Sequence, residues 1–69
     1  MLKQDVIDHF GRQALVAETL NISQAAVSRW GDIIPEKQAF RLAYLTEGAL
    51  VYDQVFYHNL HQLKRALNV

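Results

Sequence analysis

One short segment carries side chains with which a protein can distinguish one base pair from another. Gln24 can pair bidentately with adenine, and Arg29 can pair with guanine or contact a phosphate. Ser23 and Ser28 add hydroxyls that both donate and accept hydrogen bonds. These residue types predict an outward face that can hydrogen-bond to base edges in the DNA major groove.

The residues around this face have the spacing of a helix-turn-helix. Ala17 is a small residue midway along a helix predicted at 13–20, where a second helix can cross closely. Asn21 tolerates the left-handed backbone that ends a helix abruptly, and Ser23 is a natural N-cap for a helix at 24–30. The predicted buried supports are Val16, Leu20, Ile22, Val27 and Trp30. Because helical hairpins without a DNA role share these features, a plain hairpin is the alternative.

The rest of the chain is also predicted to be helical. Helices are expected at 3–10, where Gly11 supplies a stop, at 35–46, and from 53 to 67. Residues 49–52, ALVY, could be an extended connector or the start of a strand. The residues expected to face the core from 35–46 are Ala39, Phe40 and Ala43, with Leu42 as a further candidate. The tyrosines expected at the core edge, with their hydroxyls in water, are Tyr44, Tyr52 and Tyr57.

Length and composition limit the classes of protein that need considering. Sixty-nine residues make one small domain, 1–69, which is too short to enclose a substrate pocket, and no phosphate loop or nucleophile motif is present. The chain has no cysteine and no apolar run long enough to span a membrane, so we expect a soluble protein. His58 and His61 lack a third ligand and are expected to be exposed rather than metal-bound. We therefore predict no enzymatic activity, cofactor, small-molecule ligand or metal site.

Net charge and the C-terminal pattern leave two questions open. Seven basic residues balance seven acidic ones, which counts mildly against DNA because phosphate neutralisation drives non-specific binding. Apolar residues near the C-terminus form nearly a heptad seam, and these are Phe56, Leu60, Leu63 and Leu67. The helix at 53–67 can pack on its own domain, or Leu60, Leu63 and Leu67 can face a second copy. The two arrangements are compatible if Phe56 points inward.

Several motifs together make the chain resemble the Cro repressors of lambdoid temperate phages, especially the all-helical branch, and related prophage regulators. The motifs are DVIDHFG at 5–11, QxxVAxxLxIS at 13–23, AAVSxW at 25–30, IPEKxAxRL at 34–42 and GALxY at 48–52. The resemblance implies an all-α, five-helix, lambda-repressor-like domain whose second and third helices form the helix-turn-helix. Some Cro relatives build a C-terminal β-hairpin instead, which only the LVY segment favours here.

The resemblance also implies a cytoplasmic repressor, in a bacterial host cell, that binds a palindromic double-stranded operator as a homodimer. By motif position it points to a base-facing set of Ser23, Gln24, Ala25, Ser28 and Arg29. Gln13 is placed to bond a phosphate, with Arg12 and Lys37 nearby. For Arg12, Lys37 and Arg41 the alternative is solvated surface charge. The rival function is a helical, antitoxin-like protein-interaction module without sequence-specific DNA binding.

Overall fold

The computed structural model describes the backbone of residues 1–67 and the side chains of residues 1–66. Its helices are α1 (Lys3–Phe10), α2 (Gln13–Leu20), α3 (Gln24–Ser28), α4 (Glu36–Leu45) and α5 (Gln54–Leu67). In the described part of the chain the only β pairing is an isolated antiparallel bridge between Leu2 and Ile33. The prediction of an all-α, five-helix domain is confirmed, and residues 49–52 are a connector rather than a strand.

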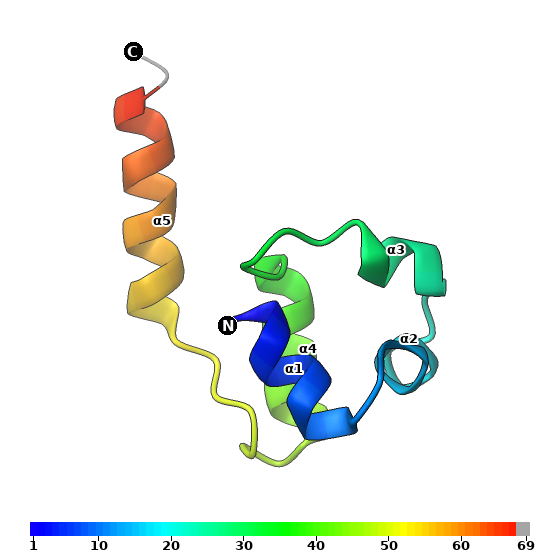
Figure 1. The fold of residues 1–69 in the computed structure, drawn as a ribbon. Coiled ribbons are helices and arrows are strands. Elements are labelled where there is room, and N and C mark those ends of the chain that lie inside the picture. The colour runs from blue at the N-terminus through cyan, green and yellow to red at the C-terminus, as the bar shows by residue number, and fades with distance from the viewer. Residues whose placement is uncertain (68–69) are drawn as a thin grey trace.

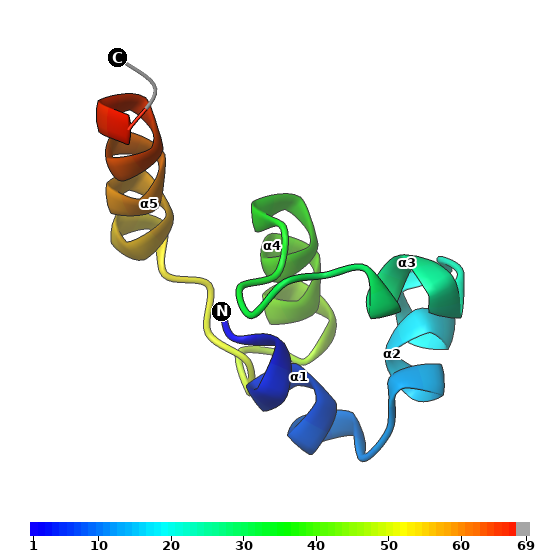
Figure 2. The same cartoon turned by 45° about the horizontal axis from the view of Figure 1, so that its top comes forward.

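Four helices form one body, and the fifth lies beside it. Figure 1 shows α1 to α4 gathered together, with α5 at the end of an extended connector. Figure 2, turned by 45°, shows the same separation and shows α2 and α3 side by side. The N-terminus lies on the side of the body that faces α5 (Figure 1). None of the helices in residues 1–67 is long and apolar enough to cross a membrane.

Two left-handed residues end the first two helices, as the sequence predicts. Gly11 has φ 90° and donates its N–H to the Ile7 carbonyl at 2.7 Å. Asn21 has φ 54° and ψ 46°, and the N–H of Ile22 reaches back to the Ala17 carbonyl at 3.0 Å. The second arrangement is a Schellman-type helix end, which turns the chain sharply from α2 into α3.

The buried core unites the helix-turn-helix with its supports. The most buried hydrophobic residues are Val6, Val16, Ala17, Leu20, Val27, Ile34, Ala39, Leu42, Leu50 and Tyr57. Ile22 and Trp30 are partly buried and pack against this cluster. Burying one valine or leucine side chain contributes roughly 1.5–3 kcal/mol. The predicted buried face of the helix-turn-helix is therefore present, and it anchors α3 to the domain core.

Two predictions about individual helices are wrong. The second motif helix ends at Ser28 rather than Trp30, because the N–H of Trp30 donates to the Val27 carbonyl and the last turn tightens. Phe40 is 63% exposed rather than buried. The face that α4 presents to the core carries Ala39 and Leu42, so Phe40 is rotated away, and its ring forms a T-shaped pair with the ring of Tyr52.

The prediction that the Tyr57 hydroxyl lies in water is also wrong. Tyr57 is buried, and its hydroxyl donates to the Ile34 carbonyl at 2.9 Å and accepts from the Met1 amino group at 3.1 Å. Tyr57 lies in the first turn of α5, and its two bonds join that turn to Met1 and to the segment before α4. Burial, assisted by the nearby charge of Glu36, raises the pKa of Tyr57 to about 12.

The two ends of α5 differ in burial. At its start, the Asp53 carboxylate accepts the Phe56 N–H at 3.0 Å, and Phe56 and Leu60 pack against the core. In the second half of the helix Leu63 is 57% exposed. The predicted role of Leu67 concerns a side chain outside those described. Thus the apolar contacts of α5 with the domain come from its first half.

A side-chain cluster at Glu36 adds to this attachment. The Glu36 carboxylate accepts a hydrogen bond from the Tyr52 hydroxyl and lies 3.1 Å from the His61 Nε2 on α5. The hydrogen bonds from Tyr52 and then from His61 lower the pKa of the Glu36 carboxyl below its ordinary value. This cluster connects α4, the connector and α5.

Candidate nucleic-acid interface

The orientation of α3 is determined by its cap and its buried residue. The hydroxyl of Ser23 accepts the Ala26 N–H at 3.0 Å, as expected of an N-cap. Val27 is fully buried beneath the helix, whereas Gln24, Ala25 and Ser28 are exposed. A helix that buries one side on the core offers the other side to a partner. The outward side of α3 is the polar one.

The predicted base-facing residues share this exposed face but differ in their hydrogen-bonding freedom. All five, Ser23, Gln24, Ala25, Ser28 and Arg29, are exposed. The hydroxyl oxygens of Ser23 and Ser28 each already accept one intramolecular bond, so each retains its O–H donor and one further lone pair. Arg29 follows the last residue of α3 and has helical backbone angles. Its guanidinium therefore extends the polar face beyond the end of the helix.

Gln13 connects the two motif helices. Its side-chain Nε2 donates to the Gln24 carbonyl at 3.3 Å and to the Ser28 hydroxyl. An amide nitrogen has two hydrogens, and both are directed at α3. A phosphate bond from this side chain would need one of them to be released. The backbone N–H groups at the start of α2 remain available, as at any helix N-terminus.

The other predicted phosphate contacts are exposed at helix starts. Arg12 is the N-cap residue of α2 and has an extended backbone, and Lys37 lies in the first turn of α4. Arg41 is different, because its guanidinium donates to the Leu20 carbonyl at 2.9 Å and to the Gln38 side chain at 3.0 Å. Arg41 therefore closes the carboxyl end of α2 and stabilises the motif from within.

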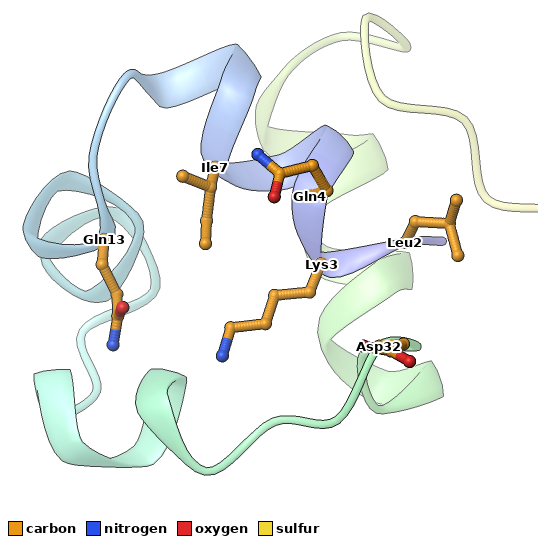
Figure 3. A pocket seen from close by; sticks show the side chains of 6 residues that line it. All are labelled: Leu2, Lys3, Gln4, Ile7, Gln13 and Asp32. Atoms are coloured by element: carbon orange, nitrogen blue, oxygen red, sulfur yellow. The ribbon is translucent and has the colours of Figure 1, made fainter.

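Lys3 is a residue near α3 that sequence reasoning missed. Its ammonium group lies 3.4 Å from the Ser28 carbonyl and 3.3 Å from the Trp30 carbonyl. Figure 3 shows Lys3 from α1 and Gln13 from α2 both extending toward α3. One signal was available: Lys3 is the first residue of α1, where the helix dipole disfavours a cation.

A fixed polar helix that crosses a second helix, with its buried side in the domain core, is the arrangement of a helix-turn-helix protein. The family model described as the DNA-binding transcriptional regulator Cro matches residues 2–61, and the chain belongs to this family. Members of the family are transcriptional regulators, so the prediction that the chain is not an enzyme is confirmed. The suspected resemblance to Cro repressors is confirmed as well.

Individual relatives agree with this assignment. The chain is 58% identical over 57 residues to the regulatory protein cro of Salmonella phage P22, covering 83% of this chain and 93% of that protein. It is 37% identical over 67 residues to the repressor protein of the division inhibition gene dicB of Escherichia coli strain K12, covering 96% and 88%. The solution structure of P22 Cro superposes with a TM-score of 0.76 at 58% identity, over 83% of this chain and 93% of that one.

Proposed function

We propose that this chain represses transcription by binding a palindromic operator as a symmetric pair, with α3 of each copy in the major groove. The observation that carries the proposal is the exposed polar face of α3, held by Val27 below, Ser23 at its start and Gln13 alongside. A helix fits the width of the major groove, and its outward side chains then meet base edges. Membership in the Cro family supplies the regulatory context.

The base-reading roles follow from the chemistry of the exposed side chains. Gln24 pairs with adenine through its amide, Arg29 pairs with guanine, and Ala25 contacts a thymine methyl group. Ser23 and Ser28 donate their hydroxyl hydrogens to base or phosphate oxygens. Phosphate groups are held by Arg12, by Lys37 and by the backbone N–H groups at Gln13, which leaves the Gln13 side chain on α3.

The pair is formed through the second half of α5. A palindromic site requires two recognition helices at a fixed spacing, which a two-fold contact provides. Leu63 is exposed and available for that contact, and the exposed part of Leu60 lies beside it. In the sequence, the spacing of Leu67 continues the same heptad pattern. Phe56 packs on its own domain, so one helix can serve the core and the partner.

The repressor so proposed is a single domain, 1–69, in the cytoplasm of a bacterial host, where its operator lies. It needs no cofactor or small-molecule ligand for the proposed activity. Its net charge of zero predicts weak non-specific binding, so discrimination must come from α3.

Selection of bound sequences from a pool of random duplexes tests this function. The expected product is a palindrome with half-sites about one helical turn apart. Binding of the selected duplex is then followed against salt concentration, and the log–log slope should be roughly −0.9 per phosphate neutralised. An antitoxin-like protein-interaction module would bind no duplex even at low salt, and an asymmetric selected sequence would contradict the symmetric pair.

A further inference from the structure

The carbonyl end of α3 needs support from outside the helix. Helix α3 has five residues, a length at which a helix is unstable by itself and depends on tertiary contacts. Its start is capped by Ser23 and its middle is held by Gln13. At its other end the chain departs after Ser28, which leaves carbonyl groups without helical donors.

Lys3 supplies hydrogen bonds at that end. Its ammonium group is 3.4 Å from the Ser28 carbonyl and 3.3 Å from the Trp30 carbonyl, so one cation joins α1 to the exit of α3. These contacts are at the long end of the hydrogen-bond range, but the donor is charged and two carbonyls share it. Among the described side chains no carboxylate lies within ion-pairing distance of Lys3.

The backbone of Lys3 is itself fixed. Its N–H donates to the Asp32 carbonyl at 2.8 Å, and Leu2 pairs with Ile33 in the antiparallel bridge. The N–H of Ile34 donates to the Met1 carbonyl at 3.1 Å. Residues 1–3 therefore form a short ladder with the segment that follows α3, and the lysine side chain projects back from this ladder to the helix.

An open cavity separates α1 from the end of α3, so the hydrogen bonds of the Lys3 side chain are needed to join the two. The space, about 500 Å³, lies where α1, the start of α2 and the segment after α3 meet. Figure 3 shows its lining residues, Leu2, Lys3, Gln4, Ile7, Gln13 and Asp32. Because the space is open, packing does not join α1 to the end of α3 there. The connections across it are polar, with Gln13 on one side and Lys3 on the other.

We infer that Lys3 is a positioning residue for operator recognition. It holds the carbonyl end of α3, with Ser28 and Arg29, at the angle that base reading requires, and it does not itself contact DNA. The inference rests on the proposed function, since it assumes that α3 reads bases. Loss of this tether lets the end of α3 move, which weakens contacts with base edges more than contacts with phosphates.

Lys3→Met tests the inference, because methionine keeps an unbranched apolar chain and removes the donor. The dissociation constant is measured for a selected operator duplex and for a scrambled duplex of equal composition, at several salt concentrations. We expect operator affinity to fall roughly three- to tenfold, as for loss of about one hydrogen bond. Affinity for the scrambled duplex should change less than about twofold, and the salt slope should stay the same.

Lys37→Met is the matched control, since it removes the same charge from a predicted phosphate neighbour. It should weaken binding to both duplexes together and reduce the salt slope by about 0.9 for each copy, or about 1.8 for the pair. Lys3→Arg keeps a charged donor and should recover most of the operator affinity. Thermal unfolding of each variant verifies that binding is measured on folded protein, and Lys3→Ala, which also removes the donor, replaces Lys3→Met if that variant does not fold.

Equal loss on both duplexes with a smaller salt slope would overturn the inference, because Lys3 would then be a phosphate contact. The inference would also be overturned if Lys3→Met had the same ratio of operator affinity to scrambled-duplex affinity as the wild type, whether or not its melting temperature is lower. If the wild-type chain itself fails to discriminate between the duplexes, the proposed function fails. If the wild type discriminates and Lys3→Met does so equally well, only the role of Lys3 fails.

Discussion

The side-chain amide of Gln13 donates a hydrogen bond to the hydroxyl of Ser28, joining the first residue of α2 to the last residue of α3. The same amide donates to the Gln24 carbonyl at the start of α3. One side chain therefore spans the length of the short helix that carries the proposed base-reading groups. The angle between the two helices depends on this polar bridge as well as on the packing beneath them.

Replacing Gln13 by alanine should weaken operator binding with little effect on the fold. Two exposed hydrogen bonds are lost. We expect their loss together to cost about 0.5–1.5 kcal/mol of binding free energy, which corresponds to a roughly 2- to 12-fold rise in the dissociation constant. Titration of a labelled operator duplex measures the change. Gln13→Glu should be at least as harmful, because it removes the donor and adds a negative charge beside the DNA. Full affinity in both variants would contradict the role of the bridge.

Arg29→Ala should cost about 1–3 kcal/mol of operator affinity and relax the preference at one base pair in each half-site. The guanidinium is exposed just past the end of α3, where it can reach a guanine edge. Repeating the random-duplex selection with the variant reports the position that is relaxed. Arg12→Ala is the control, with a uniform loss across sequences and no relaxed position. A uniform loss in Arg29→Ala would mean that Arg29 contacts only phosphate.

Leu63→Lys should abolish pairing of the chain and weaken operator binding. The side chain is 57% exposed in the second half of α5, and a lysine there places two like charges across a two-fold contact. Sedimentation equilibrium with and without operator measures the pairing. Tyr44→Lys, at an 80% exposed position on α4, should leave both properties unchanged. A Leu63→Lys chain that still pairs and binds would rule out α5 as the contact.

Asn21→Ala should destabilise the fold by about 1–2 kcal/mol, because a β-carbon is unfavourable in the left-handed conformation at φ 54°. Asn21→Gly should not carry this cost, since glycine adopts that conformation freely. Urea denaturation of both variants gives the free energies of unfolding. Asn59→Ala, on the exposed surface of α5, is the matched control and should be neutral or slightly stabilising. Equal stabilities of the two Asn21 variants would contradict the backbone argument.

Tyr57 should make stability fall at high pH. Its pKa is raised from 10.0 to about 12 in the folded chain, so its stabilising contribution is fully present below pH 10 and is lost as the pH rises toward 12. Unfolding measured from pH 9 to 12 should show this decline. Tyr57→Phe removes the titrating group and its bond to Ile34, at a cost of about 0.5–1.5 kcal/mol at neutral pH. Between pH 10 and 12 the free energy of unfolding of this variant should therefore fall less than that of the wild type.

The amino-acid sequence by itself determined the helix-turn-helix. Ala17, Asn21 and Ser23 are local signals, because a close helix crossing, a left-handed turn and an N-cap each need a particular residue type at a particular position. Short-range preferences of this kind are expressed wherever the chain folds, and all three occur in the structure. The exposed polar face of α3 follows from the same spacing.

Only the tertiary structure decided which polar groups act within the protein. Lys3, Gln13 and Arg41 all carry donors suited to phosphate, yet each is directed at a backbone carbonyl of the motif that is at least 11 positions away in the sequence. Phe40, expected in the core, is exposed, and the Tyr57 hydroxyl, expected in water, is buried. Both differences arise because burial depends on where α5 and the connector pack. Sequence patterns report the face of a helix on which a side chain lies, whereas its partner depends on distances between segments that only the folded chain brings together.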